Sequence, residues 1–71
     1  MARYKVSFRV DNKTYYTEGD STYPSDDAIK KNEIDMEMAL ESAFVFASSL
    51  KRSLNLEGMI EPGSIKFEIY K

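Results

Sequence analysis

The stretch Glu41–Leu50, "ESAFVFASSL", decides the fold of this 71-residue chain. Taken alone, its centre Phe44-Val45-Phe46 has the aromatic and β-branched content of a strand. The surrounding sequence favours a helix instead, because apolar residues recur at spacings of four and three along one stripe. The stripe consists of Met36, Leu40, Ala43, Ala47, Leu50 and Leu54, with Ala39 and Phe46 at its edge. We therefore predict a helix that buries this stripe.

The predicted helical segment spans residues 25–57, and its capping residues indicate where it begins and where it is interrupted. Ser25 is a suitable N-cap and is followed by two aspartates, which the positive end of the helix dipole favours. Asn32 is a second capping residue. The sequence leaves open whether 25–57 is one helix or two with a break near Asn32, the main helix then running from about residue 33 to 57. We expect Gly58 to end it in a left-handed conformation.

Three shorter segments alternate between apolar and polar residues, which is typical of half-buried strands. The first spans residues 3–10, the second residues 14–17 and the third residues 65–70. A two-residue loop at Asn12-Lys13 would join the first two and place Val10 opposite Tyr15. The inward positions, which we expect beneath the helix, are Tyr4, Val6, Phe8, Val10, Ile65, Phe67 and Ile69.

The element order is therefore β-β-α-β, which indicates an α+β fold in a single domain, residues 1–71. A right-handed crossover from the second strand to the third would leave the first strand central. We predict a three-stranded, antiparallel-type sheet of order 2-1-3 with one long helix packed on one face. The residues that we expect in its core include Phe8, Leu40, Leu50 and Phe67.

Composition excludes several kinds of chemistry. The chain has no cysteine, so disulfides and thiolate metal sites are excluded, and no histidine, the usual general base near neutral pH. The spacing of Ser48 and Lys51 matches a serine-enzyme motif whose companion motifs are absent. We predict a protein that is not an enzyme, with no catalytic residues, no metal site and no cofactor.

Charge and hydropathy bear on location and partners. The chain carries 10 basic and 12 acidic residues, a net charge of −2, so neither sign dominates. Its alternating N-terminus does not resemble a signal peptide, and no apolar run approaches the roughly 20 residues of a membrane span. We expect a cytoplasmic protein without membrane contact.

Some apolar residues of the helix lie away from the buried stripe. Ile34, Met38 and Val45 fall roughly opposite it, and Phe44 lies on its flank. In a domain of one sheet and one helix nothing else covers them, and a contiguous apolar patch often marks an interface. The predicted protein interface consists of Ile34, Glu37, Met38, Glu41, Phe44 and Val45, in which the two glutamates form an acidic rim.

The uncovered face of the sheet offers an alternative site. Basic residues interleaved with aromatics on an open sheet are typical of nucleic-acid platforms. The residues concerned are Arg3, Lys5, Arg9, Tyr16, Lys66 and Tyr70. Glu18, Asp20 and Glu68 belong to the same face and nearly balance its charge, which is unfavourable for binding phosphates.

The sequence thus favours a small interaction protein, and its motifs indicate no family. We expect it to self-associate as a homodimer or higher oligomer, to bind and modulate a larger protein, or both. Its size, acidity and lack of cysteine are common among accessory and inhibitor proteins of phages and mobile elements. A nucleic-acid-binding module that uses the open sheet face is the alternative.

Overall fold

A hairpin of two nine-residue strands, β1 (Ala2–Val10) and β2 (Lys13–Ser21), opens the chain in the computed structural model, which describes residues 1–70. Its two-residue turn is Asp11-Asn12, with φ of 51° and 65°. Both values lie in the left-handed region that a type I′ hairpin turn requires. The predicted loop at Asn12-Lys13 was therefore wrong by one residue, and Val10 pairs with Lys13 rather than Tyr15. This shift of two residues in the pairing keeps every side chain on its predicted face.

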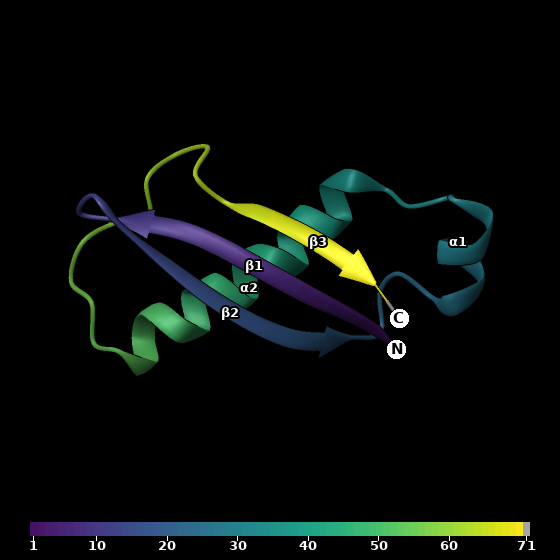
Figure 1. Ribbon diagram of the computed structural model, residues 1–71, viewed down its shortest axis with the longest axis horizontal. Coiled ribbons are helices and arrows are strands. Elements are labelled where there is room, and N and C mark those ends of the chain that lie inside the picture. Colours follow the sequence, from purple (N-terminus) through teal and green to yellow (C-terminus); the bar gives the residue numbers. More distant parts are fainter. Residues whose placement is uncertain (71) are drawn as a thin grey trace.

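The third strand, β3 (Lys66–Tyr70), pairs antiparallel with β1 and completes the predicted order β2-β1-β3. Figure 1 shows β1 between the two other strands. The turn before β3 has Gly63 at φ 75°, and the backbone N–H of Ser64 donates to the carbonyl of Glu61 at 3.1 Å. Proline at the second and glycine at the third position of this turn satisfy the demands of type II geometry.

The segment before β3 contains two helices, α1 (Asp26–Lys31) and α2 (Met36–Ser53). Ser25 caps α1 as predicted, since its hydroxyl accepts from the backbone N–H of Ala28 at 3.1 Å. The helix ends at Asn32 in the left-handed conformation, so the predicted break lies at this residue. Asp35, and not Asn32, caps α2: its carboxylate accepts from the N–H of Glu37 at 2.9 Å.

The C-terminal end of α2 lies earlier than predicted. Asn55 has a φ of 58° and donates to the carbonyl of Arg52, while Leu56 donates to the carbonyl of Lys51. These two bonds form a Schellman motif, in which asparagine takes the position expected for Gly58. Gly58 serves a steric purpose instead, because a Cβ there would lie 2.5 Å from the carboxylate of Asp11.

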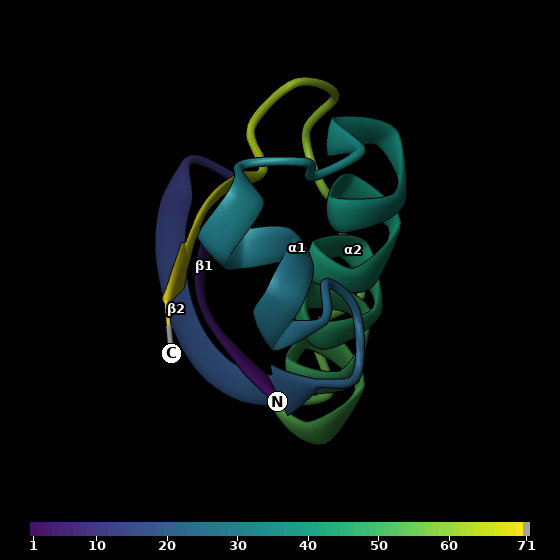
Figure 2. The ribbon, with the colours of Figure 1, turned by 90° about the vertical axis from the view of Figure 1, so that its right-hand side faces the viewer.

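The sheet forms one layer and α2 the other, as the side view in Figure 2 shows. The core between them consists of Ala2, Tyr4, Val6, Phe8, Val10, Ala39, Ala43 and Ala47, with Leu50 and Phe67 among the half-buried residues packed against it. Phe8, Leu50 and Phe67 therefore lie where the sequence placed them. The prediction for Leu40 was wrong, because its side chain is exposed.

The predicted stripe of α2 is rotated away from the sheet, so that one edge of the stripe and not its centre is buried. Ala39, Ala43 and Ala47 are fully buried, whereas Met36, Leu40 and Leu54 are exposed. The bulk of the core comes from the sheet, where the side chains of Tyr4 and Phe8 are fully buried. Small residues on the facing side of α2 let the helix backbone approach these rings closely.

α2 is also longer than the sheet is wide. Its 18 residues extend about 27 Å, whereas the axes of three neighbouring strands span only about 10 Å. Figure 1 shows α2 crossing the strands steeply, so that its first turn extends beyond β3 and its last turn beyond β2. Met36 and Leu54 lie at the two ends of α2 and are 61% and 49% exposed, as expected where no strand lies beneath the helix.

Candidate protein-interaction surface

The first part of α2 carries a dense group of exposed apolar side chains. Met38, Leu40, Phe44 and Val45 are exposed by 48%, 45%, 50% and 63%, and Met36 lies beside them. These five residues fall within ten positions of one helix, whereas the other large exposed apolar residues of the described chain, Met1, Tyr16, Leu54 and Met59, are scattered. Scattered apolar residues are normal on protein surfaces, but a contiguous group indicates a contact surface.

The five side chains form two rows. Met36, Leu40 and Phe44 recur every fourth residue along one flank of α2, which we call the flank row. Met38 and Val45 are seven positions apart and point away from the sheet, which we call the outer row. The two rows enclose an acidic strip that is formed by Glu37 and Glu41.

The structure brings five of the six predicted interface residues together on this surface. Met38, Phe44, Val45, Glu37 and Glu41 are all exposed. Ile34 is the exception, because it precedes α2, is half-buried and packs against the core. The helical periodicity that placed it opposite the stripe does not apply, since residues 32–35 between α1 and α2 are not helical.

Of the flank row, sequence reasoning predicted only Phe44 as an interface residue. Met36 and Leu40 were predicted in the core because they share the apolar stripe with the buried alanines. The size of the side chains is the signal that distinguishes them: three alanines spaced by four residues mark the side of α2 that approaches a bulky sheet.

The acidic strip is not neutralised within the domain. Among residues 1–70, no ion pair involves Glu37 or Glu41. Two glutamates four residues apart in a helix repel each other by about 0.2–0.5 kcal/mol. The Asp35 carboxylate beside them accepts hydrogen bonds from the backbone N–H groups of Glu37 and Met38. The negative charge of the strip therefore continues to the N-cap of α2.

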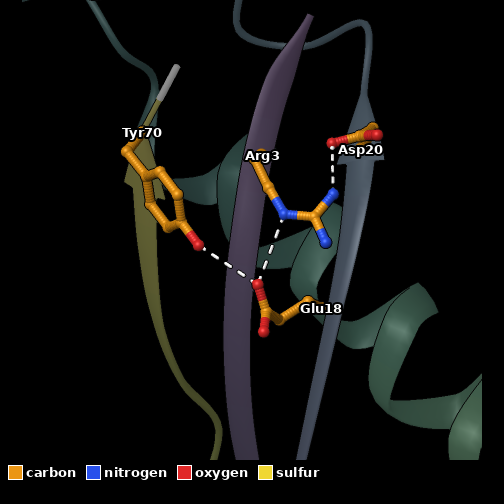
Figure 3. A network of polar contacts seen from close by, with 4 residues as sticks. All are labelled: Arg3, Glu18, Asp20 and Tyr70. Atoms are coloured by element: carbon orange, nitrogen blue, oxygen red, sulfur yellow. Dashed lines mark hydrogen bonds and ion pairs between the residues drawn. The ribbon is translucent and has the colours of Figure 1, made fainter.

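The opposite face of the molecule carries the residues of the alternative, nucleic-acid site. Figure 3 shows Arg3 between two carboxylates: its Nε lies 3.3 Å from Glu18 Oε1 and its Nη1 lies 3.1 Å from Asp20 Oδ1. The hydrogen bond with Asp20 is the main reason that the pKa of Arg3 is raised above its usual value. Tyr70 donates its hydroxyl to the same oxygen of Glu18 at 3.1 Å.

Two further cations of this face are also engaged. Arg9 Nε lies 3.3 Å from Glu61 Oε2, and Lys5 Nζ lies 5.4 Å from the centre of the Tyr70 ring. Lys66 and the exposed Tyr16 line a shallow depression of ≈ 760 Å³ together with Lys5, Glu18 and Glu68. The six predicted residues thus share one face, but carboxylates pair with both arginines. Little uncompensated positive charge is left to hold a phosphate backbone.

The ammonium group of Lys51 donates to the carbonyl of Leu56 at 3.1 Å, which fixes the chain after α2. Within residues 1–70, no three acidic side chains gather as a metal-binding group. Across the same residues, no helix combines the length and the apolar character that a membrane span requires.

Comparison of the chain with family models, curated proteins and solved structures finds no match. The function is therefore inferred from geometry and physical chemistry alone.

Proposed function

We propose that this chain is a small, non-enzymatic interaction protein that binds and modulates a larger protein through the outer side of α2. The contact centres on Met38, includes Phe44 and Val45, and has Glu37 and Glu41 at its rim. We place the protein among accessory or inhibitor proteins of the cytoplasm, of the kind that phages and mobile elements encode.

The observation that carries this proposal is the group of large apolar side chains that folding leaves in water. Val45 is 63% exposed and Met38 is 48% exposed, although alanines occupy the buried side of the same helix. Each side chain of this size gains about 1.5–3 kcal/mol when it is fully buried. Folding of this chain leaves much of that free energy unused, and a protein partner that covers the surface would gain it.

The chemistry of the surface indicates the kind of partner. Methionine is flexible and polarizable, so Met38 adapts to the shape of an apolar pocket or ridge. The unpaired carboxylates of Glu37 and Glu41 favour a partner whose contact surface is basic around an apolar centre. Rim charges of this kind contribute more to the association rate and to partner choice than to affinity.

Met38→Lys tests the proposal, with Met59→Lys as the matched control. Met59 is exposed in the loop between α2 and β3, so the control makes the same chemical change outside the proposed contact surface. A partner that is captured by the wild type is purified, and its affinity for each variant is measured by calorimetry. We expect Met38→Lys to lower the affinity by tenfold or more, because a charge replaces an apolar contact at the centre, and Met59→Lys to leave it unchanged.

Circular dichroism and thermal melting check that Met38→Lys remains folded. A purified partner that binds Met38→Lys as tightly as the wild type contradicts the proposal. Loss of the fold in Met38→Lys contradicts it as well, because that result places Met38 in the core.

A further inference from the structure

The outer edge of β3 is open. β3 pairs with β1 on one side only, and it is the last strand of the sheet. Within residues 1–70, no backbone hydrogen bond links β3 to any segment other than β1. A row of free N–H and C=O groups on a strand edge is a template for pairing with another strand. Proteins commonly guard such edges with proline, a bulge or charged side chains. β3, "KFEIY", contains no proline, and its two charged side chains are of opposite sign.

The sequence around β3 is complementary to itself. Ile65-Lys66-Phe67-Glu68-Ile69 reads apolar, positive, apolar, negative, apolar, with Phe67 at its centre. In an antiparallel pair of two such strands with Phe67 opposite Phe67, each Lys66 opposes a Glu68 and each Ile65 opposes an Ile69. Opposite charges directly across a strand pair are favourable, and like charges are unfavourable.

The other edge of the sheet lacks this property. The outward side chains of β2 carry only negative charge, on Glu18 and Asp20. Arg3 of the same chain already binds both carboxylates (Figure 3). Pairing of two β2 strands would therefore form no favourable charge pair on this face, whereas pairing of two β3 strands would form two.

The overhang of α2 lies at the same edge as the open side of β3. Figure 1 shows the first turn of α2 beyond β3. Met36 begins this turn and is exposed. A strand added to the open edge of β3 would lie beneath this first turn of α2 and would cover Met36. The two-fold axis that relates two antiparallel β3 strands stands perpendicular to the sheet. Both copies of α2 then cover the same face, and their N-terminal ends, with Leu40 of the flank row, meet over the joint.

We propose that two copies of the chain form a two-fold symmetric dimer by antiparallel pairing of their β3 strands, with Phe67 at the axis. The dimer has a continuous six-stranded sheet and buries part of the flank row of each α2. A stable interface takes about 800 Å² from each partner, roughly a sixth of the 5068 Å² surface of the chain. Oligomerisation is also a common source of stability for domains of this size.

This inference does not rest on the proposed function. The outer row, Met38 and Val45, points away from the sheet, so a larger protein can bind it on either copy of the dimer. Variants of Met38 and variants of β3 therefore test different surfaces.

Charge exchange at β3 tests both the dimer and its register. Lys66→Glu places two Glu–Glu pairs across the joint, and Glu68→Lys places two Lys–Lys pairs there. Each single variant is expected to weaken dimerisation about tenfold, and the double variant Lys66→Glu/Glu68→Lys to restore it. An equimolar mixture of the two single variants should form a mixed dimer, because each Glu then opposes a Lys. Sedimentation equilibrium over a concentration series measures the solution mass of the wild type, the three variants and the mixture.

Both positions are exposed, so the variants are expected to fold, which circular dichroism verifies. Leu40→Ala should also weaken the dimer, whereas Met38→Lys should leave its mass unchanged. A wild-type chain that stays monomeric throughout the series overturns the inference. Single variants that dimerise like the wild type, or a double variant that is not restored, also overturn it. Met38→Lys could instead lower the solution mass to that of a monomer while the β3 charge variants have no effect. That result would assign self-association to the outer row and would also overturn the inference.

Discussion

The two sides of α2 differ in a way that is the reverse of an ordinary surface helix. The side that faces the sheet has Ala39, Ala43 and Ala47, all fully buried, at its centre, with Phe46 and Leu50 half-buried beside them. The other sides carry methionine, leucine, phenylalanine and valine in water. The difference shows that the space available beneath α2 decides which of its side chains are buried, because the rings of Tyr4 and Phe8 from the sheet fill the core. The large side chains of α2 that lie outside are only partly buried by folding, and we propose that they serve binding.

The largest effect on stability is expected when a small buried side chain of α2 is made large. Ala43→Leu adds volume where Ala43 is fully buried, and we expect it to lower the free energy of unfolding by about 1–3 kcal/mol. Leu40→Ala removes a similar volume from the exposed flank, and we expect a change of only about 0.5 kcal/mol. Urea denaturation measures both, in the Lys66→Glu background so that association contributes little.

Equal losses from the two variants would contradict the comparison. A loss of about 2–5 kcal/mol from Leu40→Ala alone would mean that Leu40 is a core residue and that α2 packs as its apolar stripe first indicated.

The sequence predicted the layers well because a period of two leaves little choice. Tyr4, Val6, Phe8 and Val10 can share a face only in a strand, and all four are buried. The faces were right even though the turn was misplaced. Asp11 and Asn12 both tolerate the left-handed conformation, and only the pairing with β2 shows that both adopt it.

The rotation of α2 about its axis could not be predicted from the sequence, and the reason is physical. A helical stripe of six or more apolar residues is wide, and either edge of it can face the sheet. The choice depends on how closely the helix approaches the rings beneath it, which is a property of the assembled core. The same limit applies to the proposed interface. Periodicity predicted Met38 and Val45 as contact residues, whereas the exposure of Met36 and Leu40 follows only from how the folded helix lies on the sheet.

Phe46 sharpens the comparison, because it is a large residue of α2 that does lie on the inner side. Its ring centre is 5.5 Å from that of Tyr4, and a Cβ on Gly19 of β2 would overlap the ring. The missing side chain at Gly19 therefore makes room for Phe46. We expect Gly19→Ala to destabilise the fold by about 1–2 kcal/mol, since overpacking outweighs the smaller entropy of the unfolded chain.

Thermal or urea denaturation measures this effect, and the double variant Gly19→Ala/Phe46→Leu provides the control. If the clash with the ring is the cause, Gly19→Ala should cost less in the Phe46→Leu background than in the wild type. An equal cost in both backgrounds would assign the effect to the strand backbone.

The smallest effect concerns the one hydroxyl group among the fully buried side chains of the core. Tyr4 donates its hydroxyl to the backbone carbonyl of Tyr23 at 2.7 Å. Burial raises the pKa of Tyr4, and a hydrogen bond with the Ser42 side chain offsets part of the rise. A tyrosine whose pKa is higher in the folded state contributes stability that is present below its unfolded pKa of about 10 and is lost as the pH rises through the folded value.

Tyr4→Phe should therefore lower the free energy of unfolding by about 0.5–1.5 kcal/mol at neutral pH, where it removes the hydrogen bond to Tyr23. The gap between wild type and variant should narrow above about pH 10, because only the wild type has a buried phenol to ionise. Urea denaturation of both proteins at a series of pH values measures the gap, and the other tyrosines and the lysines titrate alike in the two chains. A gap that stays constant from neutral pH to about pH 11 would show that the phenol of Tyr4 ionises as readily in the folded state as in the unfolded one. The ring would then not be enclosed between α2 and the sheet, and the close approach of the alanine side of α2 would have to be abandoned.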